Sequence, residues 1–202
     1  MQALVCHAPM DLRVESFPTD PLGPQQVRVH VAHGGICGSD LHYFQHGGFG
    51  TVRLQQPMVL GHEVSGIVAE VGQAVQHLRP GQRVAISPSR PCGQCVYCQR
   101  GHQNHCLDMR FYGSAMRFPH IQGAFRQDLV IEAYQAHPLR DDMDLSLAAL
   151  AEPLRGFARH RTGGLGVWQN GARHRLRPDW QFAHWGAAPR RCGAHRGGRS
   201  ER

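Results

Sequence analysis

The chain has no lysine, and all 22 of its basic residues are arginine. Such a complete bias indicates the composition of the source more than a functional demand. The arginines are unevenly placed, because residues 1–154 carry a formal charge of −2 and residues 155–202 a charge of +9, within a total of +7. The positive charge of the protein is therefore a property of its last quarter.

Long apolar runs are also missing. No window approaches the roughly 18 consecutive apolar residues of a membrane-spanning helix, and residues 1–11 lack the basic flank and apolar run of a secretory signal. We therefore expect a cytoplasmic protein that does not enter the membrane. In a reducing compartment, closely spaced cysteines favour metal binding over disulfide formation.

Four cysteines form a compact pattern, Cys92-x2-Cys95-x2-Cys98-x7-Cys106. Four thiols at this spacing are enough to close a tetrahedral zinc site, and a disulfide-bonded cluster is the alternative. The surrounding loop, residues 88–103, is rich in Pro, Gly and Gln and has no apolar periodicity. Because such a loop cannot order itself by burial, we expect metal coordination to hold it.

A second group comprises Cys37, His62 and Glu63. Zinc accepts a thiolate, an imidazole and a carboxylate, and three protein ligands leave a fourth position open, as in catalytic sites. Each signal also has an ordinary structural interpretation. A single cysteine is often a small buried apolar residue, and a His-Glu pair between glycines is often a surface turn.

The first three-quarters of the chain has the pattern of a mainly β domain. Apolar residues recur in short runs at 3–5, 27–31, 65–71, 83–86 and 128–131, separated by Pro and Gly. This predicts antiparallel strands in a small barrel or sandwich. One short helix is expected at residues 40–44, capped by Ser39 or Asp40, and another at 145–151, capped by Asp144 and ending at Glu152 before Pro153.

From residue 155 onward, Gly, Arg, His and Trp follow one another without helical or strand periodicity. The glycine-rich stretch at 162–168 lacks the last glycine of the dinucleotide-binding fingerprint, because Gln169 stands there. We expect residues 155–202 to be an irregular basic tail, a frameshift product or a disordered segment. The alternative is a tail that binds nucleic acid.

Gly61-His62-Glu63-x2-Gly66-x5-Gly72-x2-Val75 resembles the zinc signature of the zinc-containing alcohol dehydrogenases, within the medium-chain dehydrogenase/reductase superfamily. Residues 36–43, 109–115 and 117–125 resemble its sorbitol and L-idonate 5-dehydrogenase branch. The resemblance spans about residues 1–154. It implies a GroES-like β-barrel catalytic domain, which in the family is followed by a Rossmann domain for NAD or NADP. We expect that domain to be absent and the chain to be truncated.

The resemblance also implies roles for individual residues. Cys37 and His62 match the catalytic zinc ligands, Glu63 and Glu152 match two glutamates at that metal, and Cys92, Cys95, Cys98 and Cys106 match the structural zinc lobe. Ser39 and His42 match a proton relay. Such a relay suits the chemistry, because zinc lowers the pKa of an alcohol and the released proton then needs a path to solvent. Without the resemblance, Ser39 is explained equally well as a helix cap, and His42 is explained better as a surface histidine.

The sequence therefore predicts a zinc-dependent NAD(P) oxidoreductase of the L-idonate 5-dehydrogenase or polyol dehydrogenase type, which converts a secondary alcohol to a ketone. Its substrate would be a small-molecule polyol or sugar acid, and the resemblance implies that full-length members form homo-oligomers. We do not expect nucleic acid as a partner. We expect the chain to be inactive at this length. The alternative is a non-catalytic zinc-binding module whose basic tail binds nucleic acid.

Overall fold

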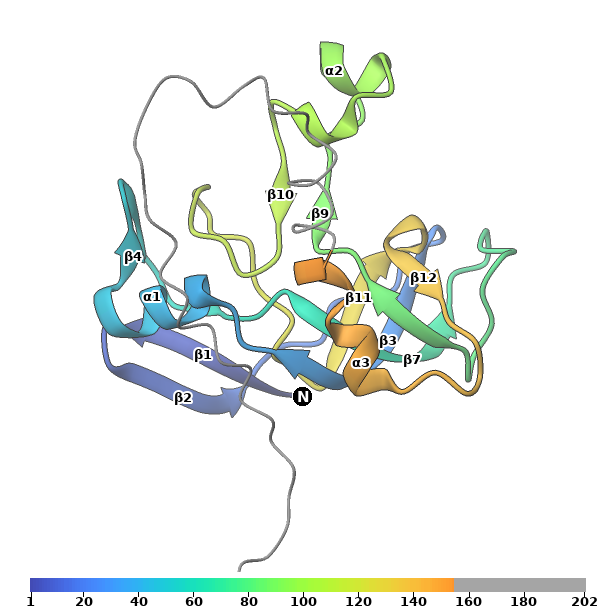
Figure 1. Cartoon of the computed structure of the whole chain (residues 1–202), viewed down its shortest axis with the longest axis horizontal. Coiled ribbons are helices and arrows are strands. Elements are labelled where there is room, and N and C mark those ends of the chain that lie inside the picture. Colours follow the sequence, from blue (N-terminus) through green and yellow to red (C-terminus); the bar gives the residue numbers. More distant parts are fainter. Residues whose placement is uncertain (155–202) are drawn as a thin grey trace, which may run out of the picture. The chain divides into compact units, whose positions relative to one another are not determined.

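The computed structural model describes residues 1–154. The expectations for residues 155–202, an irregular tail and its possible role with nucleic acid, lie outside the described residues. Within residues 1–154 the protein is mainly β with few, short helices (Figure 1), which confirms the predicted fold class. No helix in this part of the chain is long and apolar enough to cross a membrane.

The largest sheet has five antiparallel strands in the order β11-β3-β7-β8-β12. Its strands are β3 (Gln26–Gly35), β7 (Glu63–Val71), β8 (Arg83–Ile86), β11 (Asp128–Glu132) and β12 (Ala136–Pro138). The alternating runs at 27–31, 65–71, 83–86 and 128–131 all fall in these strands, as predicted. Alternation is informative here because one face of each strand enters the core.

A second sheet has three strands in the order β2-β1-β6, formed by β1 (Gln2–Ala8), β2 (Asp11–Ser16) and β6 (Met58–Val59). Two short hairpin-like pairs complete the strands. They are β4 (Gly48–Phe49) with β5 (Val52–Arg53), and β9 (Ser89–Arg90) with β10 (Arg110–Phe111). The β9–β10 pair leads from the sheets to the cysteine-rich segment, which contains α2 (Val96–Gln99) and η1 (Gln103–His105) (Figure 1).

The first helix, α1 (Gly38–His46), begins two residues earlier than expected. Its N-cap is Cys37, so the expectation that Ser39 or Asp40 caps it is wrong. Asp40 instead occupies the third helical position, and its carboxylate accepts a hydrogen bond from the backbone N–H of Cys37 at 3.0 Å. A carboxylate one turn inside a helix can reach back to the cap residue in this way.

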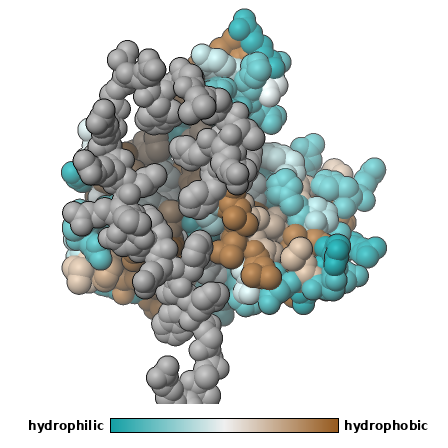
Figure 2. Space-filling model, viewed as in Figure 1, coloured by the Kyte–Doolittle hydropathy of each residue, from teal (hydrophilic) through white to brown (hydrophobic). Residues whose placement is uncertain are grey.

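The last described helix, α3 (Leu145–Ala149), has the predicted cap, because the Asp144 carboxylate accepts from the backbone N–H of Ser146 at 2.7 Å. The helix ends at Ala149, earlier than expected, and residues 151–154 are helical again. Leu147 and Leu154 are each 60% exposed, and Figure 2 shows an apolar area over this part of the molecule.

The main core lies on one face of the five-stranded sheet. It is built largely from β-branched residues, which suit half-buried strands. Its fully buried members include Val27, Val29, Val84, Leu129 and Ile131. A smaller cluster of Cys6, Tyr43, Met58, Leu60 and Ala115 joins α1 to the second sheet, and Phe125 packs against both clusters. The two sheets are therefore bound together by apolar contacts.

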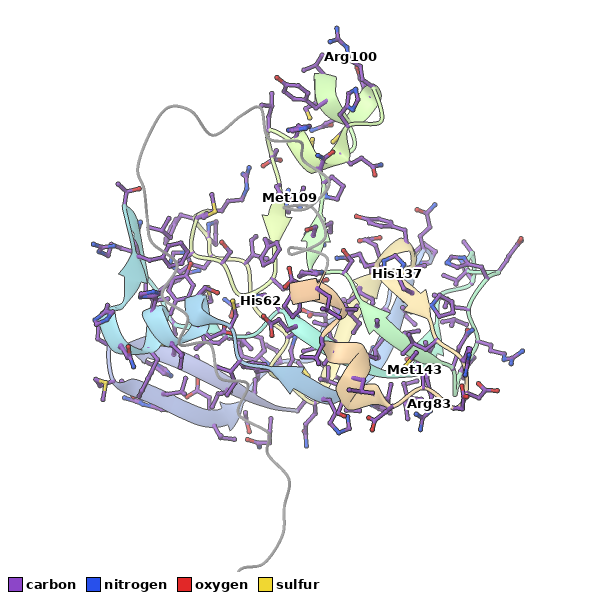
Figure 3. The ribbon with its side chains drawn as sticks, in the orientation of Figure 1. His62, Arg83, Arg100, Met109, His137 and Met143 are labelled. Atoms are coloured by element: carbon purple, nitrogen blue, oxygen red, sulfur yellow. The ribbon has the colours of Figure 1, made fainter. Side chains whose placement is uncertain are left out.

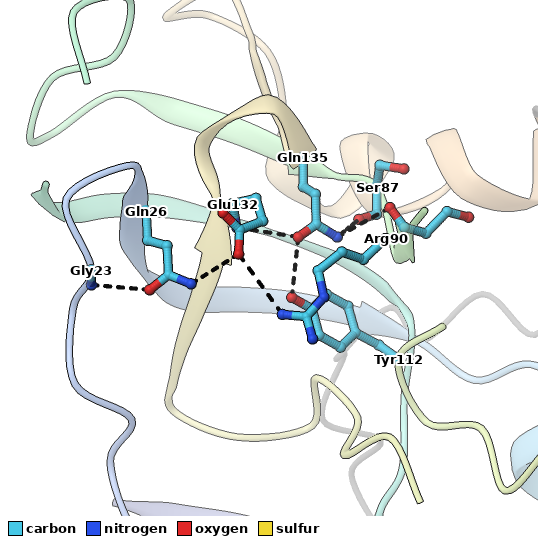
Figure 4. Close-up of polar contacts among 8 residues, drawn as sticks. Gly23, Gln26, Ser87, Arg90, Tyr112, Glu132 and Gln135 are labelled. Atoms are coloured by element: carbon cyan, nitrogen blue, oxygen red, sulfur yellow. Dashed lines mark hydrogen bonds and ion pairs between the residues drawn. The ribbon is translucent and has the colours of Figure 1, made fainter. Parts of the chain in front are cut away.

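A buried polar network supports the edge of the core beside η2 (Ala133–Gln135) (Figure 4). Gln135 is fully buried, and its amide donates to the carbonyl oxygens of Ser87 at 2.9 Å and Ser89 at 3.3 Å. Its oxygen accepts from the hydroxyl of Tyr112 at 3.3 Å. Because each buried group has a partner, the network fixes the position from which β9 departs.

We predict that the buried Tyr112 side chain makes the folded protein less stable at alkaline pH. Burial raises its pKa to about 12, whereas an unfolded tyrosine has a pKa of about 10. The contribution of Tyr112 to the free energy of unfolding is complete below about pH 10. This contribution is lost between about pH 10 and 12, because the unfolded chain releases the phenolic proton at a lower pH than the folded chain. The free energy of unfolding lost over this range is about 2–3 kcal/mol.

Urea unfolding from pH 8 upward should therefore show a shallower alkaline decline for Tyr112→Phe than for the unaltered chain. Tyr97→Phe, at a tyrosine that is 39% exposed, is the matched control and should keep the original slope. Equal slopes for all three proteins would contradict the account of Tyr112.

Candidate metal centres

The pairing of β3 with β7 brings Cys37 to His62. The two strands are antiparallel and their register pairs Gly35 with Glu63. Cys37 follows the end of β3 by two residues, and His62 immediately precedes β7. Residues that are far apart in the sequence thus meet at one end of the sheet. Figure 3 shows His62 in the interior, between α1 and the strands.

The ligand atoms of Cys37, His62 and Glu63 all lie within 4.8 Å of one another. His62 is 5% and Glu63 7% exposed, so the group is largely withdrawn from water. A side chain at Gly35 would overlap the Glu63 carboxylate, which explains the glycine at this position. The structure therefore brings these three predicted site residues together.

The electrostatics of the group suit a divalent ion. The His62 ring lowers the pKa of the Cys37 thiol, which favours the thiolate. Burial raises the pKa of the Glu63 carboxyl. Nδ1 of His62 is buried and has no hydrogen-bond partner within residues 1–154. A thiol, a carboxyl and an imidazole whose ligand atoms lie within 4.8 Å of one another form a donor set that fits zinc.

Asp40 is a component of this site that the sequence analysis treated only as a possible cap. It is 3% exposed, and besides Cys37 its carboxylate accepts from the backbone N–H of Gly61 at 3.0 Å. Its Oδ1 lies 3.9 Å from Nδ1 of His62. Asp40 therefore ties together the two chain segments that carry Cys37 and His62.

Glu152 lies near this group but outside the set of atoms within 4.8 Å. Burial is the largest influence on the pKa of both His62 and Glu63, and the charge of Glu152 is a smaller influence that raises both pKa values. Glu152 also lines a cavity of about 440 Å³ together with Met109 and Phe111. Its role as a metal ligand stays a prediction.

Ser39 and His42 lie three residues apart on α1 and have different environments. Ser39 lines a second cavity, of about 360 Å³, together with His62 and Phe111. His42 is exposed, and its ring lies 5.8 Å from that of His46 and 6.2 Å from that of Phe49. Among the described residues no hydrogen bond joins Ser39 to His42, so the proton relay stays a prediction.

The other predicted cluster is also assembled, because the sulfur atoms of Cys92, Cys95, Cys98 and Cys106 lie within 4.8 Å of one another. Backbone N–H groups point at these sulfurs. Cys92 donates to Cys106 at 3.2 Å, and Cys95 donates to Cys92 at 3.4 Å. The N–H groups of Leu107 and Cys98 lower the pKa of the Cys95 thiol to about 6. These contacts favour the thiolate of Cys95, the form that binds metal, whereas burial raises the pKa of the Cys98 thiol to about 12.

A mainly β domain with a three-ligand group beside a cavity and a separate four-thiol lobe has one open and one closed ligand set of the kind that zinc proteins use. Residues 23–141 match the alcohol dehydrogenase GroES-like domain, and the chain belongs to this family.

The chain is 48% identical over 139 residues to L-idonate 5-dehydrogenase (NAD(P)(+)) of Escherichia coli (strain K12), a match that covers 68% of this chain and 40% of the relative. It is 33% identical over 189 residues to sorbitol dehydrogenase of Bacillus subtilis (strain 168), covering 94% of this chain and 50% of the relative. This second alignment extends beyond residue 154, into the segment that the motifs did not relate to the family.

The crystal structure of L-idonate 5-dehydrogenase from Escherichia coli superposes with a TM-score of 0.69 and 42% sequence identity, covering 76% of this chain and 43% of that one. The chain thus spans about 40–50% of the length of these relatives.

Replacing Asp40 tests its structural role. In Asp40→Asn the side chain keeps one acceptor oxygen, so either Cys37 or Gly61 loses the acceptor for its backbone N–H. We expect the free energy of unfolding to fall by about 1–3 kcal/mol, measured by urea denaturation.

The control is Asp141→Asn, at an exposed position, which should change stability by less than about 0.5 kcal/mol. An Asp40→Asn protein as stable as this control would show that the two backbone contacts contribute little.

Proposed function

We propose that this chain forms the zinc-binding catalytic part of an NAD(P)-dependent dehydrogenase that oxidises a secondary alcohol of a polyol or sugar acid to a ketone. The observation that carries the proposal is the convergence of Cys37, His62 and Glu63 beside a cavity of about 360 Å³. That volume is in the range of small-molecule sites. Family membership and the names of the relatives support the reaction class.

Each residue of the site has a separate proposed role. Cys37, His62 and Glu63 would hold the ion, with Glu152 entering from the adjoining cavity. Zinc in this position supplies Lewis acidity, which lowers the pKa of an alcohol. Asp40 holds the ligand-bearing segments in register, as the contacts of its two oxygens indicate.

Ser39 would accept a proton from a substrate hydroxyl as it releases its own, a role supported by its position in the lining of the same cavity as His62. His42, on the exposed face of the same helix, would pass that proton to solvent. The side chains of Tyr43, Phe111 and Ile121 line the cavity and would exclude water from the reacting carbon.

A second zinc is proposed for the four-cysteine lobe. The lobe makes few apolar contacts of its own, with Cys98 its one buried cysteine, so coordination would supply most of its order. Reduced thiols of this kind persist in the cytoplasm, where we place the protein.

Metal analysis tests both assignments. The purified chain should contain two zinc ions, because it carries two separate ligand groups. Cys37→Ser should retain about one zinc with near-normal stability. Cys95→Ser should lose the lobe zinc and be destabilised, because metal binding and folding are coupled there.

The measurements are zinc content by elemental analysis and urea denaturation. Fewer than one zinc in the unaltered chain would contradict the lobe assignment. Loss of all zinc in Cys37→Ser would show that the two groups are not independent.

Hydride transfer needs a bound nicotinamide cofactor. The L-idonate relative carries NAD(P)(+) in its name, and we extend that cofactor class to the dehydrogenase proposed here. The sequence contains no complete dinucleotide fingerprint, since Gln169 replaces the required glycine. The chain should therefore produce no NADH or NADPH from L-idonate or sorbitol. Clear turnover, followed by absorbance, would contradict this expectation.

A further inference from the structure

The cavity of about 360 Å³ beside His62 contains a cationic side chain that the proposed chemistry does not use. Arg117 lines this cavity together with His62 and Ser39, and its walls are otherwise largely apolar, with Tyr43, Phe49 and Phe111 among them. Among the described residues 1–154, no carboxylate lines the cavity. Within residues 1–154, Arg117 is thus the one permanently charged group in this lining, and its ion-pair partner Asp108 lies outside the lining.

Contacts on one side hold the Arg117 guanidinium in place. Nε donates to the carbonyl oxygen of Met109 at 2.9 Å, and Nη1 forms an ion pair with Asp108. Nη2 takes part in no hydrogen bond or ion pair within residues 1–154. The side chain is 37% exposed, so the guanidinium is oriented by the protein yet open to a ligand. A guanidinium oriented in this way is suited to a carboxylate or phosphate.

We infer that Arg117 binds an anionic group on the polyol chain of the substrate, while the reacting hydroxyl lies at the His62 end of the cavity. This inference rests on the proposed function and narrows its substrate class to acidic sugar derivatives, either sugar acids or sugar phosphates. Arg117 is then a specificity-determining residue. A neutral polyol would fill the same space without the charge-assisted contact and would bind more weakly.

The Arg117–Asp108 ion pair also has a purely structural interpretation, in which it stabilises the loop that follows β10. Two variants distinguish this structural role from ligand binding. Arg117→Gln removes the charge and keeps a hydrogen-bonding side chain of similar reach. Asp108→Asn keeps the arginine and removes its ion pair. A structural role predicts similar effects for both, whereas ligand binding predicts a loss of acid preference only for Arg117→Gln.

The test is isothermal titration calorimetry on the zinc-loaded 202-residue chain. The ligands are L-idonate and its neutral counterpart L-iditol, and sorbitol 6-phosphate and its neutral counterpart sorbitol. We expect at least one acid to bind about tenfold more tightly than its counterpart. The ligand pair that shows this preference tells whether the bound anion is a carboxylate or a phosphate.

Arg117→Gln should abolish that preference while leaving the affinity for the neutral polyol within about twofold. Asp108→Asn should keep it. Arg110→Gln is the matched control, because it removes the same charge at an exposed position that lines a different cavity, and it should also keep the preference.

Equal binding of acid and polyol, or an unchanged preference in Arg117→Gln, would overturn this inference and leave the proposed function standing. Loss of the preference in Arg110→Gln as well would assign it to overall charge and overturn the role of Arg117. Binding of neither ligand class would overturn both the inference and the proposed function.

Discussion

The candidate site depends on the antiparallel pairing of β3 with β7. That pairing runs from Val27 opposite Val71 to Gly35 opposite Glu63. The buried valines of the two strands, including Val29 and Val68, fix its register through the core. A shift of one residue would turn the apolar side chains outward. It would also separate Cys37 from His62, so the same apolar contacts that stabilise the sheet determine the geometry of the ligands.

Two different kinds of interaction hold the two metal-ligand groups. The Cys37 group lies at the end of a well-packed sheet, and Asp40 links its segments through backbone hydrogen bonds. Its geometry is therefore set by the fold before any ion binds. The four-cysteine lobe sits beyond the short β9–β10 pair and has little core of its own. An open site placed on a rigid scaffold suits substrate exchange, whereas a closed lobe suits a structural ion.

Much of this could be predicted from the sequence, because the relevant signals are local. Alternation predicted four of the five strands of the main sheet, all but β12. The spacing of the cysteines predicted the four-thiol lobe. The predicted start of α1 was less accurate, because aspartate is a common N-cap residue and Asp40 was therefore interpreted as a possible cap. Its actual partners are the backbone N–H groups of Cys37 and Gly61, and the second of these is distant in the sequence.

The cavity was not predictable from local patterns. Its lining combines residues of α1 with residues 109–121, two segments joined by the hydrogen bond that the backbone N–H of Ala115 donates to the Tyr43 hydroxyl at 2.9 Å. The presence of Arg117 was visible in the sequence, but its orientation depends on Met109 and Asp108. Glu152 could be associated with the site only through the family resemblance, because it lies far along the chain from Cys37 and His62.

The central claim is that Cys37 and His62 bind the same ion. A crystal structure of the zinc-loaded chain, with anomalous scattering recorded at the zinc edge, measures this most directly. The account predicts a peak about 2.3 Å from the sulfur of Cys37 and about 2.0–2.1 Å from a ring nitrogen of His62, with a second peak in the cysteine lobe. A structure in which Cys37 and His62 share no peak would contradict it.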